Sequence, residues 1–247
     1  MTQKKERYAI LDILRGFAIL NMVVLHGIWD LIYIYNIEIP WLDFDKTFYY
    51  QELGRWLFVL LSGFCRPLSR QKISRTLVVL AFSLIITAVT LVVFPDSPIH
   101  FGILSLIGTG MLLMPVLDKP LKKVNPYIGF ILFVLLFVLT KNVSFGYIGL
   151  GHFKAKLPEF LYCNLFTAYL GFPAPDFYSS DYFPLVPWLF LYEAGFFLHH
   201  IFKQRDWLKH LSCIRIRWLE WIGRNTLYIY VLHQPIIYGV LYFIFGY

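Results

Sequence analysis

An apolar stretch near the N-terminus carries two pairs of ionisable residues. In LDILRGFAILNMVVLHGIWD, residues 11–30, Asp12 and Arg15 are three positions apart, and His26 and Asp30 are four positions apart. Residues at these spacings share one face of a helix. A carboxylate beside an imidazole orients the ring and stabilises its protonated form. We therefore predict that His26 acts as a catalytic base and that Asp30 orients it.

The last apolar stretch repeats this order. In IGRNTLYIYVLHQPI, residues 222–236, Arg224 and Asn225 precede His233. At a rise of about 1.5 Å per residue, the arginine and the histidine lie about 13 Å apart here and about 16 Å apart in the first stretch. Two helices that cross a membrane in the same direction would bring the arginines to one depth and the histidines to another. We predict that His233 and Asn225 help hold the reacting group of a substrate or polarise its carbonyl oxygen.

The composition indicates that these groups lie in an integral membrane protein. Of the 247 residues, 58% are hydrophobic and only 15% are charged, which is too little polar surface for a soluble globule. Seven apolar runs approach the length of about 20 residues that a spanning helix needs. These runs are 8–35, 49–65, 76–95, 99–117, 126–142, 183–202 and 218–245. We predict an all-α bundle of about seven transmembrane helices that forms a single domain over residues 1–247.

The basic residues indicate the orientation of the bundle. The formal net charge is +7, and most lysines and arginines fall in the N-terminal segment and in alternate connections between the apolar runs. The positive-inside rule then places the N-terminus in the cytoplasm and the C-terminus outside. This topology accounts for the basic excess, so we expect no nucleic-acid partner.

Several arginines gather at the predicted cytoplasmic end. Arg66, Arg70 and Arg75 follow the second apolar run, and by the predicted topology they share this end with Asp12, Arg15, Arg224 and Asn225. Guanidinium groups bind phosphate with paired hydrogen bonds, so we predict a site for the phosphates of a substrate here. The alternative is that the arginines only anchor helices at the interface.

Other polar residues leave further alternatives. His100 opens the fourth apolar run and is a second candidate for the catalytic imidazole. The segment 143–182 is the only long irregular region, and we expect a lid or acceptor site there, or a plain connection. Its apolar patch PEFLYCNLFTAYLGF is too short for a full span and suits an interfacial or re-entrant helix. The three cysteines, Cys65, Cys163 and Cys213, have no metal-like spacing, so we predict no metal site.

The sequence resembles the transmembrane acyltransferases. RYAILDILRGFAILNMVVLH at residues 7–26 is similar to the opening helix of the acyltransferase-3 group, where an Asp-x-x-Arg precedes a functional histidine by the spacing of Arg15 and His26. FVLLSGFCRPLSRQKISR at 58–75 and the closing stretch at 222–236 resemble later motifs of that group. HFGILSLIGTGMLL (100–113) and DYFPLVPWLFLYEAGFFL (181–198) resemble more closely the small bacterial proteins related to heparan-α-glucosaminide N-acetyltransferase.

This resemblance implies an acyl-CoA-dependent N- or O-acetyltransferase. Such an enzyme takes an acetyl group from acetyl-CoA on the cytoplasmic side and transfers it to an amino or hydroxyl group of a sugar or glycan at the outer face. The resemblance implies a multi-pass protein of a bacterial cell membrane, with the lipid bilayer, acyl-CoA and the acceptor as partners. The oligomeric state stays open between a monomer and a homodimer. So does the chemical route, either general base catalysis by His26 or an acetyl-histidine intermediate.

Two other functions remain compatible with the same residues. A transporter or flippase could use a proton or substrate path through the bundle, formed by Arg15, His26, Asp30, Glu193 and His233. A subunit or sensor could have lost its active site, and Ser105, where the bacterial relatives often have a second histidine, leaves that open.

Overall fold

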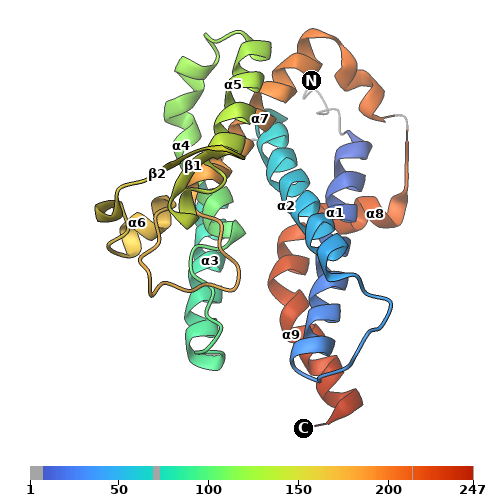
Figure 1. Ribbon diagram of the computed structural model, residues 1–247. Helices are drawn as coiled ribbons and strands as arrows, with labels where there is room; N and C mark the ends of the chain where they lie inside the picture. The colour runs from blue at the N-terminus through green and yellow to red at the C-terminus, as the bar shows by residue number, and fades with distance from the viewer. Residues whose placement is uncertain (1–7, 69–72, 213, 247) are drawn as a thin grey trace. The chain divides into compact units, whose positions relative to one another are not determined.

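The computed structural model describes residues 8–68, 73–212 and 214–246, which are predominantly helical (Figure 1). Its longer helices are α1 (Ala9–Tyr33), α2 (Phe44–Cys65), α3 (Ile73–Val93), α4 (Ile103–Leu121), α5 (Pro126–Thr140), α7 (Leu185–Gln204) and α9 (Thr226–Phe245). The shorter elements are η1 (Arg66–Leu68), η2 (Val143–Phe145), β1 (Tyr147–Leu150), β2 (Phe153–Lys156), η3 (Glu159–Leu161), α6 (Leu165–Leu170), η4 (Trp207–Ser212) and α8 (Arg217–Arg224).

The prediction of a polytopic helical membrane protein is confirmed. Within the described residues, six helices are long and apolar enough to cross a membrane: α1, α3, α4, α5, α7 and α9. The remaining predicted run forms α2, which is long enough but carries polar residues such as Glu52 and Arg55 near its middle. The orientation of the chain in the membrane stays a prediction.

The last apolar run forms two helices rather than one continuous span. α8 ends at Arg224 and α9 begins at Thr226, with Asn225 between them at φ −106° and ψ 18°. The Asn225 side chain donates a hydrogen bond of 2.9 Å to the carbonyl oxygen of Trp221. Asparagine competes in this way with the helical backbone, which explains why the run divides here.

The chain divides into two compact units. The terminal unit comprises Met1–Leu61 and Phe202–Tyr247, and the central unit comprises Ser62–Ile201. In the terminal unit α1 packs against both α8 and α9, as Figure 1 shows. Gly16 of α1 faces the carbonyl oxygen of Leu219, and Gly223 of α8 faces that of Asp12. A Cβ atom at either glycine would collide with the opposite backbone, so these two positions permit the close crossing of α1 and α8.

The central unit is built around α7, most of whose side chains are buried. Tyr192, Phe196 and Phe197 are almost fully shielded from solvent. Phe197 stacks on Phe133 of α5 with 5.5 Å between ring centroids. α3 packs beside α4 but exposes most of its own surface, as expected for a helix that faces lipid.

The segment predicted to be irregular contains a β-hairpin and short helices. β1 and β2 pair in antiparallel register, with Tyr147 opposite Lys156 and Leu150 opposite Phe153. η3 and the single-turn helix α6 follow, and Asn164 caps α6 through a hydrogen bond from the backbone of Thr167. Gly171 at φ 128° ends α6, so the apolar patch around it forms no long helix.

Candidate functional site

The predicted functional residues of α1 and α9 form two clusters in the terminal unit. The first, which we call the arginine end, consists of Asp12, Arg15, Arg215, Glu220 and Arg224. The second, the histidine end, consists of His26, Asp30, Tyr230, His233 and Gln234. α1 contributes to both clusters, which gives the two a fixed separation along one helix.

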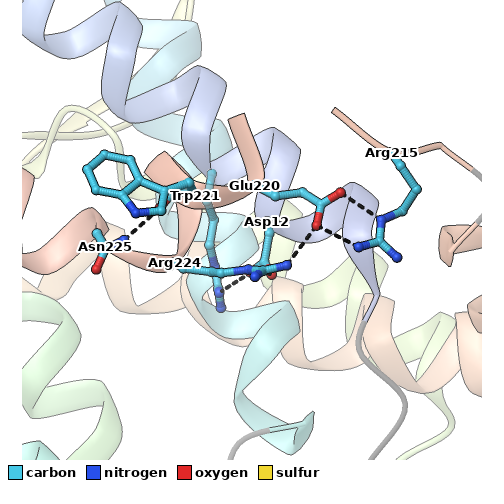
Figure 2. Close-up of polar contacts among 7 residues, drawn as sticks. Asp12, Arg215, Glu220, Trp221, Arg224 and Asn225 are labelled. Carbon is cyan, nitrogen blue, oxygen red and sulfur yellow. Dashed lines mark hydrogen bonds and ion pairs between the residues drawn. The ribbon is translucent and has the colours of Figure 1, made fainter. Parts of the chain in front are cut away.

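At the arginine end, guanidinium groups and carboxylates alternate. Arg224 lies 2.7 Å from Glu220 and 3.5 Å from Asp12, and Arg15 lies 3.6 Å from Asp12. On the other side, Arg215 reaches the Glu220 carboxylate at 2.8 and 3.2 Å. Figure 2 shows Glu220 held between Arg215 and Arg224, with Asp12 beside Arg224. Three guanidinium groups thus meet two carboxylates, which leaves one positive charge in excess.

The close crossing of α1 and α8 positions this cluster. Asp12 and Glu220 are 5% and 2% exposed, because they lie between the two helices. Arg224 is exposed, so its guanidinium group is accessible from outside the crossing. The hydrogen bond from Arg215 is the main cause that holds the pKa of Glu220 below its ordinary value, with smaller contributions from the charges of Arg215 and Arg224. Glu220 is therefore ionised at neutral pH.

At the histidine end, the two predicted histidines meet. The imidazole rings of His26 and His233 lie 5.0 Å apart between centroids in an edge-to-face arrangement. The Nδ1 atom of His233 lies 2.6 Å from the carbonyl oxygen of Tyr230. Because a carbonyl oxygen only accepts hydrogen bonds, Nδ1 carries the proton, and the neutral ring presents Nε2 as its basic atom.

Asp30 is held by a neutral partner. Its two carboxylate oxygens accept hydrogen bonds of 3.0 and 2.8 Å from the Nε2 atom of Gln234. Asp30 also interacts electrostatically with His26, and its role in orienting the imidazole stays a prediction. Asp30 is 8% exposed, and a buried carboxylate that interacts with an imidazole stabilises a positive charge on the ring.

The remaining predicted phosphate-binding residues have different local environments. Arg66 and Arg75 belong to the central unit, where Arg75 is exposed. Arg66 is buried and forms an ion pair of 2.5 Å with Asp118 of α4. Arg70 lies outside the described residues. The Asn225 amide caps the end of α8 through Trp221 (Figure 2).

His100 lines two cavities of the central unit. Their volumes are about 380 and 600 Å³, and Leu165 lines both of them as well. The backbone N–H of His100 donates to Ser179, whose hydroxyl group donates back to the carbonyl oxygen of His100. The second candidate imidazole therefore has space for a ligand beside it.

In the described part of the chain, no group of three potential metal ligands is present.

Four residues of the two clusters are not predicted from the sequence: Arg215, Glu220, Tyr230 and Gln234. Glu220 lies near the start of what reads as a single long apolar helix, and the separate helix α8 packs it against α1. Arg215 precedes α8 and joins the cluster through Glu220. Gln234 carries no charge and has no spacing signal. Its position directly after His233 is the single indication that could have pointed to it.

Comparison with known proteins identifies the family. Residues 7–235 match the family described as heparan-alpha-glucosaminide N-acetyltransferase, catalytic. Neither the curated proteins nor the solved structures gave a match to the chain. The match covers most of the chain, both of its clusters and His100. The chain therefore belongs to the heparan-α-glucosaminide N-acetyltransferase catalytic family, whose members are multi-pass membrane acetyltransferases that use acetyl-CoA as the donor.

Proposed function

We propose that this protein transfers an acetyl group from acetyl-CoA on the cytoplasmic side to an amino or hydroxyl group of a sugar or glycan at the outer face. The observation that carries the proposal is the pairing of His26 and His233 at 5.0 Å beside the buried Asp30. Two imidazoles and a carboxylate in one apolar helix pair are costly for a merely structural contact. They supply the proton acceptor that acyl transfer needs.

In the proposed reaction, His26 acts as the general base. It removes the proton of the acceptor amine or hydroxyl group while the nitrogen or oxygen attacks the thioester carbonyl. A carbon–nitrogen or carbon–oxygen bond forms, the carbon–sulfur bond breaks, and the imidazolium returns the proton to the thiolate of CoA. Asp30 favours this route because its charge stabilises the imidazolium. An acetyl-histidine intermediate on the same ring is the alternative route.

His233 has two possible roles in the same reaction. Its Nδ1–H donates to Tyr230, so the neutral ring accepts a proton at Nε2 and passes it on. Only the imidazolium form could donate a hydrogen bond from Nε2 to a developing oxyanion. We propose that His233 shares the transferred proton with His26 and polarises the carbonyl while it is protonated.

The arginine end is proposed to bind the phosphates of the donor. Arg15 and Arg224 are partly exposed, and the cluster keeps a net positive charge after its ion pairs are formed. Asn225 adjoins Arg224 and retains a second amide hydrogen for the ligand. The distance of about 16 Å along α1 from Arg15 to His26 is within reach of an extended pantetheine arm. Arg66, Arg70 and Arg75 stay predicted contributors to phosphate binding.

The test is acetyl transfer by the purified protein in lipid nanodiscs. Labelled acetyl-CoA is offered with a panel of amino sugars and cell-wall glycans, and the wild type is compared with His26→Ala and His100→Ala. We expect loss of transfer in His26→Ala by about 10²–10⁴-fold, with acetyl-CoA binding retained. Full activity of His26→Ala would contradict the assignment of His26. If His100→Ala instead showed the loss expected of His26→Ala, the reaction would be assigned to the cavities of the central unit. Acceptor flux without acetyl transfer would favour the transporter alternative.

A further inference from the structure

The β1–β2 hairpin of the central unit has one apolar and one basic face. Residues opposite each other in an antiparallel pair share a face, and successive residues alternate between faces. The observed register therefore places Ile148, Leu150, Phe153 and Ala155 on one face. The other face carries Tyr147, Gly149, Lys154 and Lys156. The hairpin is amphipathic with no exception among its eight paired residues.

The apolar face is exposed. Phe153 is 92% exposed, Leu150 45% and Ile148 37%. An isolated two-stranded hairpin is marginally stable in water, and large exposed apolar patches mark surfaces that are covered by a partner or a membrane. Because β1 packs beside α5, the hairpin is held in place while its apolar face stays uncovered.

The position of the hairpin in the chain indicates which partner covers it. The candidate membrane span that begins with α5 runs from Pro126 to Phe145, and β1 starts two residues later. The hairpin therefore begins where this candidate span ends, and the end of a span lies at the depth of the lipid headgroups. Phe145 and Tyr147, both exposed, supply the aromatic residues that are enriched at this depth.

The charge of the basic face fits the headgroup region. Lys156 is neutralised by Glu159, which lies 2.8 Å from its amino group. Lys154 lies two positions before Lys156 in β2 and is exposed. Lysines at a membrane surface attract anionic lipid by about 1 kcal/mol each. Lys154 is therefore the stronger candidate of the two for an interaction with a lipid phosphate.

We propose that the β1–β2 hairpin is an interfacial lipid-binding element. The side chains of Ile148, Leu150 and Phe153 insert at the boundary between headgroups and acyl chains, and Lys154 binds the phosphate of an anionic phospholipid. This assignment does not depend on the acetyl-transfer reaction, because none of these residues belongs to either cluster of the terminal unit.

The first experiment measures whether the two faces differ in depth. The native cysteines are first replaced by alanine, and a single cysteine is then introduced at one hairpin position in each variant. Each variant is spin-labelled at that cysteine, and the labelled protein is reconstituted in nanodiscs. Accessibility is measured to oxygen, which partitions into lipid, and to a water-soluble nickel chelate. We expect a two-residue alternation, with oxygen favoured at 148, 150 and 153 and nickel favoured at 147, 154 and 156. Several positions on each face keep the test decisive if one variant fails to fold.

Two outcomes would overturn the insertion. Nickel accessibility on both faces would show a hairpin that projects into water. Shielding of the apolar face from both reagents would show that protein covers it, and dependence of the shielding on protein concentration would identify a second copy.

The second experiment tests the lipid headgroup. An environment-sensitive fluorophore on Phe153→Cys is quenched by brominated phosphatidylglycerol in one set of nanodiscs and by brominated phosphatidylcholine in another. We expect stronger quenching by the anionic lipid, and Lys154→Gln should reduce that preference by about fivefold. Lys156→Gln is the matched control and should have a smaller effect because Glu159 already neutralises this lysine. Equal quenching by both lipids, unchanged in Lys154→Gln, would refute recognition of anionic lipid.

Discussion

The two ends of α1 each hold a buried carboxylate, but the partners of the two carboxylates differ. Asp12 contacts the guanidinium groups of Arg15 and Arg224. Asp30 accepts hydrogen bonds from the neutral amide of Gln234, and the positive charge that it can meet is that of a protonated imidazole. Asp12 is therefore always beside a positive charge, whereas Asp30 has a positive charge nearby only when a histidine is protonated.

This difference supports the proposal that the arginine end binds the donor and that the histidine end carries out the chemistry. Fixed positive charges beside Asp12 suit a ligand whose negative charge does not change during the reaction, such as a phosphate. A neutral partner beside Asp30 leaves the carboxylate able to respond when a proton arrives on His26 or His233, which is the moment at which a general base needs stabilisation. Variants at the arginine end should therefore change the affinity for the donor, and variants at the histidine end should change the rate.

The largest effect is expected for Asp30→Asn. The variant keeps the shape of the side chain and a hydrogen-bonding group for Gln234, but it removes the charge that stabilises the imidazolium. We expect kcat to fall by about 10²-fold or more, with little change in the KM for acetyl-CoA. Steady-state kinetics in nanodiscs measures both parameters. The matched variant Asp12→Asn should change KM more than kcat, and a similar kcat loss in both variants would contradict the division between the two ends.

Gly223→Ala should have the next largest effect, on stability. The added methyl group meets the backbone carbonyl of Asp12, and such overpacking costs about 1–3 kcal/mol. We expect Tm to fall by several degrees, measured by thermal unfolding in detergent. Gly239→Ala in α9 is the control, because a Cβ atom there meets nothing within 4 Å. An unchanged Tm in Gly223→Ala would show that α1 and α8 separate more easily than their crossing indicates.

Arg224→Gln should raise the KM for acetyl-CoA by about tenfold and leave kcat unchanged, since a charged hydrogen bond contributes about 1.5–3 kcal/mol. The control uses a substrate instead of a second variant. A short acetyl thioester that lacks the nucleotide phosphates should react equally well with the wild type and with Arg224→Gln. An equal loss with both donors would mean that Arg224 supports the fold and does not bind phosphate.

Arg215→Gln should have the smallest effect, and that effect should depend on pH. The pKa of Glu220 is lowered in the folded protein. Its contribution to stability is therefore present above the ordinary value of 4.5 and is lost as the pH falls through the lower folded value. We expect Tm to drop by about 1–3 °C at pH 7, with the difference vanishing in acid. A difference that persists at low pH would show that Arg215 acts through packing.

The meeting of His26 and His233 could be predicted from the sequence because helical rise converts spacing into depth. The spacings of the two arginine–histidine pairs differ by only two residues, so aligning the arginines also aligns the histidines. The composition likewise indicated the helical membrane fold, and the motifs indicated the family that the comparison confirms. The chemical roles of the residues stay predictions.

Other features could not be predicted for identifiable reasons. Gln234 is an uncharged residue in a helix and acquires its role only through its neighbour on α1. The division at Asn225 depends on one side-chain hydrogen bond, which hydropathy does not register. The hairpin could not be predicted because each strand has only four residues, which is too short for a clear alternating pattern. Its apolar and basic faces can be assigned only once the pairing register is known.

The crossing of α1 and α8 has a mechanical consequence. Side-chain contacts between helices tolerate small rotations because rotamers adjust, but Gly16 and Gly223 each face a carbonyl oxygen of the opposite backbone. Neither helix can turn about its own axis at this point without a collision. The crossing therefore makes α1 and α8 move as one rigid unit, so a displacement of Arg224 would be passed along α1 to the histidine end.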